Sequence, residues 1–281
     1  MSCNNKGNSN ETGNDKRIFI DDFNREVEVP KQIKRIFALS PALTEMLFFI
    51  CPDSLIAART QACNYPKDVF EKPEINTYPI DIEKILSIKP DIILTEEGIS
   101  SHNQLKMLAN NDLAVYSFKY SKMEDVFEAM LRISEICNCK KKAQKKIEML
   151  KEQYNKLSKD KLRNQKVLAL VWRDPIYVFG KNTLLSDQLT EIGLENAVDS
   201  IFKQAYPEIS REYFLKVNPD IIIGSTFKNL DTTLFERYPE LKRTIAYKKK
   251  MIFDIEDDIL TRPGPRSVLA MQMIKDSISN E

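Results

Sequence analysis

The sequence is poor in the residues on which most enzyme sites depend. It contains one histidine, His102, and seven glycines among 281 residues. It has no glycine-rich phosphate loop, and its single histidine lies in a polar Ser-Ser-His-Asn stretch, typical of an exposed helix start rather than of a Ser/His/Asp set. None of the apolar runs reaches the ~18 residues of a membrane-spanning helix. We therefore expect a globular chain that is not an enzyme and has no catalytic residues.

The chain also lacks an excess of charge of either sign. Lys and Arg number 42 against 41 Asp and Glu, so the formal net charge is +1. Without a positive field, the chain has no general attraction for nucleic acid. The lysine-rich stretch 140–151 includes Glu148 and has no aromatic residue, which is typical of a solvated helix face. No nucleic-acid partner is predicted.

The five cysteines do not form a metal-binding pattern. The Cys-x-Cys pair at 137–139 lacks a second pair at zinc-ligand spacing, and a disulfide within this pair would be sterically awkward in a helix. We expect no metal site, and buried or idle thiols at four positions: Cys51, Cys63, Cys137 and Cys139.

Cys3 differs from the other cysteines because a polar stretch follows it. Residues 3–15 contain no large apolar side chain, so they predict a flexible tether over residues 1–16. A cysteine at the head of a tether resembles the lipidated first residue of a mature bacterial lipoprotein. An ordinary disordered N-terminus with a free thiol is the alternative, since no apolar signal segment precedes Cys3.

One unit of sequence occurs twice, in residues 81–94 and 210–223. An offset of 129 aligns the two Pro-Asp pairs and superposes Glu83 on Glu212. Each copy has apolar residues at helical spacing, then Pro-Asp, then an unbroken apolar run. This order predicts a short helix, a proline stop and a strand buried on both faces of a parallel sheet. Two strand-like segments upstream, 35–39 and 166–170, extend the duplication, so we expect two similar lobes with the functional site between them.

The rest of the chain completes an α/β fold of two duplicated Rossmann-like lobes, with parallel-rich sheets joined by one long α-helix. Residues 17–29 alternate in polarity and predict a hairpin. Residues 123–136 and 140–162 predict two helices, and the second, of about 20 residues, would span ~30 Å as a strut between the lobes. Residues 257–266 predict a loop before a last helix over 267–278. The predicted divisions are a tether (1–16), an N-terminal lobe (17–120), connecting helices (121–163) and a C-terminal lobe (164–281).

Several motifs in order resemble one family. They are Arg-Ile-x-x-Leu-Ser-Pro-x-x-Thr-Glu (35–45), Asn-Tyr-Pro (64–66), Ile-Glu-Lys-Ile-Leu-x-x-Lys-Pro-Asp (82–91), Tyr-Pro-Glu-Ile-Ser-Arg-Glu (206–212) and Arg-Pro-Gly-Pro-Arg (262–266). Together they resemble the periplasmic-type substrate-binding proteins of ABC importers, in the rigid-helix class that binds cobalamin, haem and ferric siderophores. The Thr-x-x-Cys-x-Tyr-Pro loop at 60–66 is most similar to the vitamin B12 (cobalamin) binding proteins. Joined by a rigid helix, the lobes are expected to open and close little.

The resemblance implies a set of ligand contacts on loops of both lobes. In the first lobe these are Pro41, Ala42, Gln61, Ala62, Tyr65 and Tyr78, and in the second Trp172, Arg173, Asp174, Pro175, Tyr177, Asp258, Ile259, Leu260 and Arg262. The sequence departs from the family pattern at two of them, since some cobalamin binders have an aromatic residue in place of Ala62 and a tryptophan in place of Tyr78. These departures leave the identity of the corrinoid open.

The side chains suit a corrin, which is a wide, mostly apolar disc edged with amides. Tyr65, Tyr78, Trp172 and Tyr177 offer flat faces, and Arg173, Asp174 and Arg262 offer hydrogen bonds to amides or to the nucleotide tail. Cobalt arrives ligated within its own cofactor, so cobalamin is expected as a transported ligand and not as a catalyst. Two other ligands stay open: haem, with a tyrosine on iron, and a ferric siderophore, held by arginines such as Arg59.

The resemblance also implies partners and a location. Glu83 and Glu212 would dock on arginines of a two-fold symmetric ABC permease, because a symmetric partner requires matched charges on both lobes. The protein would be an extracytoplasmic monomer, held at the membrane only by a lipid on Cys3. An enzyme in the interlobe cleft, or a scaffold that passes a cofactor to an enzyme, are the alternatives of a different class.

Overall fold

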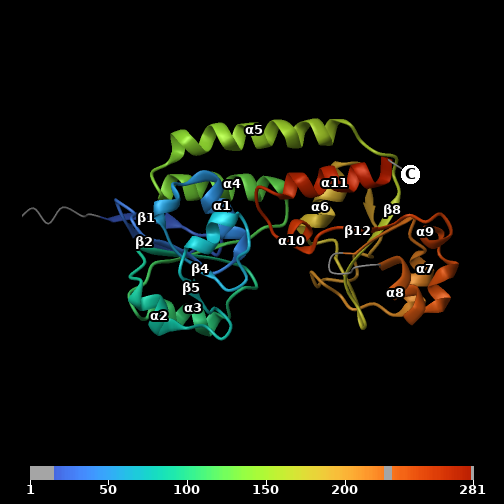
Figure 1. The fold of residues 1–281 in the computed structure, drawn as a ribbon, viewed down its shortest axis with the longest axis horizontal. Helices are drawn as coiled ribbons and strands as arrows, with labels where there is room; N and C mark the ends of the chain where they lie inside the picture. The colour runs from blue at the N-terminus through green and yellow to red at the C-terminus, as the bar shows by residue number, and fades with distance from the viewer. Residues whose placement is uncertain (1–15, 225–229, 280–281) are drawn as a thin grey trace, which may run out of the picture.

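The computed structural model describes residues 16–224 and 230–279, which form two α/β lobes under a long helix (Figure 1). Cys3 and most of the predicted tether lie outside the described residues. Lys16, predicted as the end of the tether, is instead the first residue of strand β1 (Lys16–Ile20), which pairs with β2 (Glu26–Pro30) in the predicted hairpin.

The first lobe is built on a five-stranded parallel sheet. Its strands lie in the order β5-β4-β3-β6-β7, which is the order of a doubly wound fold. The strands are β3 (Ile36–Ala38), β4 (Ile56–Thr60), β5 (Glu74–Ile75), β6 (Ile92–Glu96) and β7 (Val115–Phe118). Helices α1 (Pro41–Ile50), α2 (Ile82–Ser87) and α3 (His102–Ala109) connect them. Every residue of β3, β6 and β7 is buried, as expected for parallel strands covered on both faces.

The second lobe repeats this plan in the order β10-β8-β11-β12, with β9 antiparallel to β8. Its strands are β8 (Lys166–Arg173), β9 (Ile176–Val178), β10 (Glu195–Asn196), β11 (Ile221–Gly224) and β12 (Ile252–Asp254). Its helices are α6 (Leu184–Glu191), α7 (Arg211–Val217), α8 (Leu230–Arg237), α9 (Ile245–Lys248), α10 (Asp257–Thr261) and α11 (Ser267–Ser279). The sequence patterns did not predict α8 and α9, and α10 occupies part of the predicted loop.

The predicted duplication is confirmed in detail by the two repeat units. The offset of 129 superposes α2 on α7 and β6 on β11. Each helix is capped by the side chain of the aligned residue, Asp81 or Ser210. In each unit the aspartate after the proline accepts a hydrogen bond from the backbone at the start of the central strand: Asp91 from Arg35 at 2.8 Å, and Asp220 from Lys166 at 2.9 Å. The same contacts therefore set the same local geometry in both lobes.

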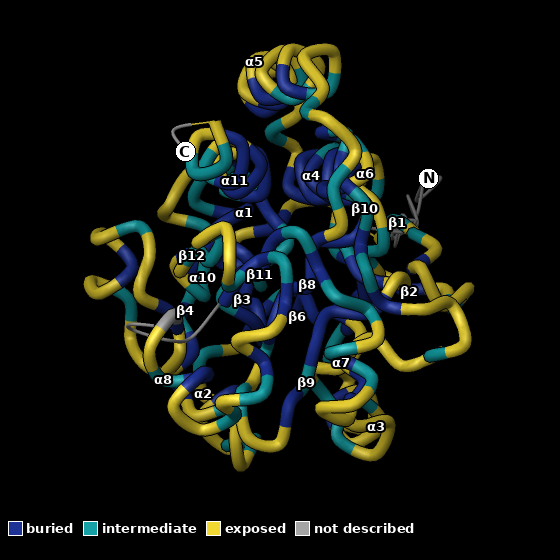
Figure 2. Tube along the Cα trace, turned by 90° about the vertical axis from the view of Figure 1, so that its right-hand side faces the viewer, coloured by how far each residue is buried: buried dark blue, intermediate teal, exposed yellow. Residues whose placement is uncertain are grey.

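The long helix α5 (Lys140–Lys159) follows α4 (Met123–Ile136), as predicted, and lies along both lobes (Figure 1). One face of α5 is apolar and buried, through Ala143, Ile147, Leu150 and Leu157. It packs on α4 and α1 of the first lobe and on α11 at the end of the chain. Figure 2 shows α5 at the outer edge, with α4, α6 and α11 in the layer beneath it.

A single hydrophobic cluster runs through this helical layer from one lobe to the other. It contains Met46 and Phe127 from the first half of the chain, and Leu189, Ile223 and Met271 from the second. Since buried apolar contacts resist separation in water, the lobes are held together over a broad surface as well as by the strut. The residues that face each other between the lobes are therefore held at fixed relative positions.

Candidate ligand-binding site

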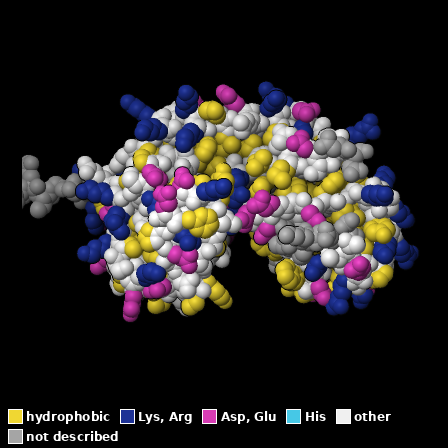
Figure 3. Space-filling model, viewed as in Figure 1, with side chains coloured by type: hydrophobic (Ala, Val, Ile, Leu, Met, Phe, Trp, Pro, Cys, Tyr) yellow, Lys and Arg dark blue, Asp and Glu magenta, His cyan; other side chains and the backbone are white. Residues whose placement is uncertain are grey.

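The loops that leave the carboxyl ends of the parallel strands carry most of the predicted ligand residues. Pro41 and Ala42 start α1 directly after β3, and residues 61–65 follow β4. Tyr78 lies between β5 and α2, residues 172–177 form the β8–β9 hairpin, and 258–262 lie in and after α10. In open α/β sheets, ligands bind at this end of the strands. Figure 3 shows the surface hollowed between the two lobes, on the side away from α5.

Three predicted aromatic residues leave much of their surface exposed. Tyr78 is 88% exposed, Trp172 51% and Tyr65 47%. Neighbours orient two of these rings: the Trp172 Nε1–H donates to the Asp174 carbonyl at 2.9 Å, and the Arg266 guanidinium lies 4.4 Å from the centre of the Tyr65 ring. Tyr177 is half-buried and donates through its hydroxyl to Glu208 at 3.2 Å. Exposed aromatic faces on loops of the first lobe and on the β8–β9 hairpin of the second suit a broad, flat ligand.

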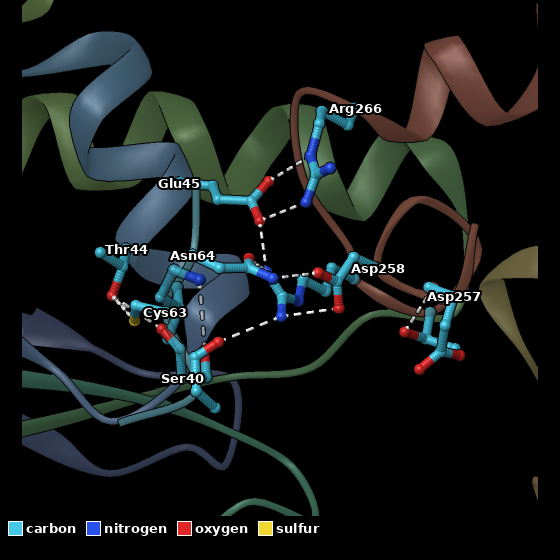
Figure 4. A network of polar contacts seen from close by, with 12 residues as sticks. Ser40, Thr44, Glu45, Cys63, Asn64, Asp257, Asp258 and Arg266 are labelled. Carbon is cyan, nitrogen blue, oxygen red and sulfur yellow. Dashed lines mark hydrogen bonds and ion pairs between the residues drawn. The ribbon is translucent and has the colours of Figure 1, made fainter. Parts of the chain in front are cut away.

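A polar network joins the lobes along one side, and we call it the interlobe clasp: Glu45, Asn64, Asp258, Arg262 and Arg266 (Figure 4). Glu45, 4% exposed on α1, accepts from Arg262 Nη1 at 2.9 Å and from Arg266 Nε at 2.8 Å. Asn64 donates to Asp258 at 2.6 Å and accepts from Arg262 at 2.7 Å. The clasp thus connects α1 and the loop after β4 to α10 and to the segment between α10 and α11.

Several residues that were predicted to contact the ligand instead take part in the clasp. Asp258 and Arg262 form an ion pair of 2.7 Å, and Arg262 also reaches the Ala62 carbonyl at 3.2 Å. Three other predicted contacts, Ala42, Ile259 and Leu260, are buried to 6% exposure or less and offer little surface. The exposed aromatic residues are therefore the main candidates for contact with a ligand.

Glu96 is a buried residue at the same strand ends that the motif analysis did not single out. It ends β6, is 9% exposed, and its Oε2 has no hydrogen-bond partner among the described residues. Burial raises the pKa of Glu96 from 4.5 to about 7, against the opposing effect of a hydrogen bond with Ser40. A buried carboxyl group without full hydrogen bonding is a frequent feature of binding sites. An acidic residue at the carboxyl end of a buried strand is the sequence signal that marks it.

The charge of Glu96 affects the pKa values of two nearby tyrosines. Burial, and secondly the Glu96 charge, raise the pKa of Tyr120, which follows β7, and of Tyr206 in the second lobe. The Tyr120 hydroxyl also lacks a hydrogen-bond partner within the described ranges. Glu96, Tyr120 and Tyr206 therefore bring polar groups from both lobes toward one place.

The pH dependence of stability tests the burial of Glu96. Because its folded-state pKa of about 7 exceeds the ordinary 4.5, the folded protein holds more protons than the unfolded chain between these values. The free energy of unfolding should therefore fall by about 3 kcal/mol as the pH rises through this window. Urea unfolding of Glu96→Gln should lack this decrease.

The neighbouring Glu97→Gln is the matched control. Glu97 is exposed and paired with Lys119 at 3.3 Å, so its removal should preserve the decrease. Parallel pH profiles for the wild type and Glu96→Gln would show that Glu96 titrates normally.

An open crevice lies between the lobes at the opposite edges of the two sheets from the clasp. It has a volume of about 690 Å³. From the first lobe it is lined by Glu97, Lys119, Tyr120, Ser121 and Lys122, and from the second by Lys181, Asn182, Ser186, Asp187, Thr190, Lys203 and Ala205. Four lysines against two carboxylates give it a positive character. One side of the interlobe surface is therefore joined by ion pairs, whereas the other side is open.

Within residues 16–224 and 230–279, no group of three or more His, Cys, Asp or Glu side chains is arranged to hold a metal ion. His102 is exposed at the first position of α3, after its cap Ser101. None of the helices in the described part of the chain is long and apolar enough to cross a membrane.

Comparison of the sequence finds related proteins over most of the chain. Residues 36–259 match the family model described as periplasmic binding protein. An uncharacterized ABC transporter substrate-binding lipoprotein of Bacillus subtilis (strain 168) is 26% identical over 273 residues, 93% of this chain and 85% of that protein. A vitamin B12-binding protein of Pectobacterium atrosepticum is 24% identical over 250 residues, 86% of this chain and 87% of that protein.

Solved structures share the fold but bind different ligands. The periplasmic vitamin B12 binding protein of Vibrio cholerae has a TM-score of 0.76 at 20% identity, and covers 88% of this chain and 96% of its own. The periplasmic heme binding protein of Vibrio cholerae has a TM-score of 0.78 at 21% identity, with 88% and 99% covered. An ABC-type Fe3+-hydroxamate transport system protein of Saccharomonospora viridis has a TM-score of 0.76 at 16% identity, with 93% and 98% covered.

Proposed function

The chain belongs to the periplasmic binding protein family, as a substrate-binding protein of the ABC transporter type, and we propose that it captures a corrinoid between its lobes and delivers it to an ABC importer. The observation that carries the ligand class is the set of exposed rings of Tyr65 and Tyr78, on loops of the first lobe, and of Trp172, near the end of β8 in the second lobe. When a flat ligand covers an exposed aromatic ring, apolar surface is removed from water, and this burial favours binding. The vitamin B12-binding relatives support the same ligand class.

The lysine-lined crevice favours a second candidate ligand. A ferric siderophore or haem carries negative charge, and Lys119, Lys122, Lys181 and Lys203 would attract it. Proteins that bind heme, or belong to hydroxamate transport, have the same fold. Haem and ferric siderophores are therefore the competitors against which cobalamin must be tested.

Isothermal titration with cyanocobalamin is the direct test, with haemin and a ferric hydroxamate as competitors. We expect a 1:1 isotherm with cyanocobalamin. Trp172→Ala and Tyr78→Ala should each weaken binding about fivefold, because each removes one aromatic contact worth roughly 1 kcal/mol. Phe23→Ala is the matched control, since Phe23 is 43% exposed in the β1–β2 turn and outside the predicted site. If the protein bound haemin or the hydroxamate but not cyanocobalamin, the corrinoid hypothesis would be wrong, whereas a role in transport would still be supported.

The positions of Glu83 and Glu212 support a docking role. Each lies in the first turn of its helix, α2 or α7, at equivalent positions of the repeat, and each is exposed. The pKa of Glu212 is lowered by hydrogen bonds from its own backbone N–H and from Ser210, so it is ionised at neutral pH. We propose that the two carboxylates bind matched basic groups on a two-fold symmetric permease.

The family and the lipoprotein relative also support an extracytoplasmic location. We propose that a lipid on Cys3 anchors the protein to the membrane surface, and that the two lobes extend over residues 16–120 and 164–281. Metabolic labelling with a radioactive fatty acid, compared between the wild type and Cys3→Ser, tests the anchor.

A further inference from the structure

Three of the five cysteines meet where α1 ends and α4 turns into α5. Cys51 is the C-terminal cap of α1, Cys137 is the C-terminal cap of α4, and Cys139 is the N-terminal cap of α5. The Sγ atoms of Cys51 and Cys139 are 3.3 Å apart, although 88 residues separate them in the chain. Both are partly exposed free thiols, whereas Cys137 is buried. This cluster lies outside the candidate ligand site.

The backbone on both sides of the cluster is fastened to neighbouring elements. Arg17 donates to the side chain of Asn138 at 3.0 Å, and Asn138 donates to the Lys31 carbonyl at 2.7 Å. Lys146 on α5 donates to the Phe49 carbonyl of α1 at 2.6 Å. These contacts hold the two helix ends in place, so the short distance between the thiols is built into the packing.

We propose that Cys51 and Cys139 are a disulfide site that joins α1 to the start of α5. A disulfide bond is about 2.05 Å long, so the two sulfur atoms must approach by only about 1.2 Å, which side-chain rotation can supply. The reactant is a low-molecular-weight disulfide such as oxidised glutathione. One cysteine thiolate attacks it and releases one glutathione thiolate; the second cysteine thiolate then attacks the mixed disulfide and releases the other. Two protein thiols are oxidised and one glutathione disulfide is reduced to two thiols.

The environment of the cluster suits a structural bond more than a fast redox sensor. The pKa of Cys51 is raised, first by its hydrogen bond with Cys137 and also by burial, and the pKa of Cys139 is raised by its hydrogen bond with Cys51. Little thiolate is present at neutral pH, so exchange is slow there. Once formed in an oxidising compartment, the bond would persist and fix the strut to the first lobe.

Peptide mass spectrometry of the full chain tests this site. The protein is equilibrated for hours at pH 8.5 with oxidised and reduced glutathione, alkylated without reduction and digested with trypsin. Arg35, Arg59, Arg132 and Lys140 bound two tryptic peptides, 36–59 with Cys51 and 133–140 with Cys137 and Cys139. We expect these peptides to be linked in the wild type and in Cys137→Ser, and separate in Cys139→Ser. The buried Cys63, on peptide 60–67, should stay unmodified and thus report that the protein remained folded.

Two results would overturn the proposal. One is the absence of the linked peptides in Cys137→Ser, and the other is an equally abundant link in Cys139→Ser, which would assign the bond to Cys137. The oxidised protein should also melt about 10 °C above the reduced protein, because the bond closes a long loop of the unfolded chain. Equal melting temperatures would refute the role of the bond in fixing the strut.

Discussion

Reversal of charge at both docking positions, in the double variant Glu83→Arg/Glu212→Arg, is expected to weaken the complex with the importer about 100-fold. Each lobe would then present a positive charge to a basic group of the permease, and like charges at an interface repel. Cyanocobalamin uptake into proteoliposomes that contain the cognate importer measures the loss. Binding of cyanocobalamin to the isolated protein should not change, since both residues are exposed on helices and neither is among the predicted ligand contacts.

The single variants and a control make this result specific. Glu83→Arg and Glu212→Arg should each weaken the complex about tenfold and to a similar extent, because the repeat relates the two positions. Glu152→Arg, an exposed residue on α5, should have no effect. If one single variant abolished uptake and the other left it unchanged, the symmetric docking hypothesis would be wrong.

The second large effect is expected from the interlobe clasp. Glu45→Gln should lower the free energy of unfolding by about 3 to 5 kcal/mol. The side chains of Arg262 and Arg266 are only 13% and 11% exposed; Arg266 loses its carboxylate partner, and Arg262 keeps only Asp258. Removal of one partner from a buried ion pair leaves the remaining charge poorly solvated, which is why the cost is large. Urea unfolding followed by circular dichroism measures it.

A surface ion pair supplies the comparison for Glu45. Glu124 lies 3.1 Å from Lys151, but its side chain is 60% exposed, so Glu124→Gln should cost less than about 1 kcal/mol. Similar losses for both variants would show that the clasp behaves as an ordinary surface contact. In that case the lobes would be held mainly by the hydrophobic layer under α5.

The asymmetry of the interlobe surface follows from the duplication together with this clasp. In the duplicated fold, β4 of the first lobe corresponds to β10 of the second, and β7 corresponds to β12. The duplication alone would therefore make the two edges of the interlobe surface equivalent. At the β4–β12 edge, Glu45, Arg262 and Arg266 join the lobes. At the β7–β10 edge, lysines such as Lys119 and Lys203 line an open crevice. We therefore expect a ligand to approach from the open β7–β10 edge rather than from the clasped edge.

Most of the fold was predictable because it depends on local patterns. The helical spacing of Ile82, Ile85 and Leu86, the proline stop and the apolar run after it encode a helix and a buried strand without reference to the rest of the chain. The same pattern at an offset of 129 then encodes the second lobe. Where the local pattern was ambiguous, prediction failed: the prolines at 263 and 265 favoured a loop over 257–266, although α10 forms before them.

The candidate site was predictable only in part, since a motif locates a loop but does not show what its side chains contact. Tyr78 and Trp172 were both predicted on loops, and the structure leaves both exposed, but Trp172 lies in strand β8. Arg262 was predicted to face the ligand, and it reaches Glu45, 217 residues away in the chain. Glu96 was not predicted, because its significance lies in burial, which depends on both lobes.

The sequence alone therefore determined the two lobes, the strut and the family resemblance, because these arise from periodicity, proline positions and motif order along the chain. Only the tertiary structure decided the interlobe clasp, the raised pKa of Glu96 and the approach of Cys51 to Cys139. Each of these depends on distance and solvent exclusion between residues that are remote in sequence. Such quantities are fixed when the helical layer packs across the lobes, and no local pattern of residues records them.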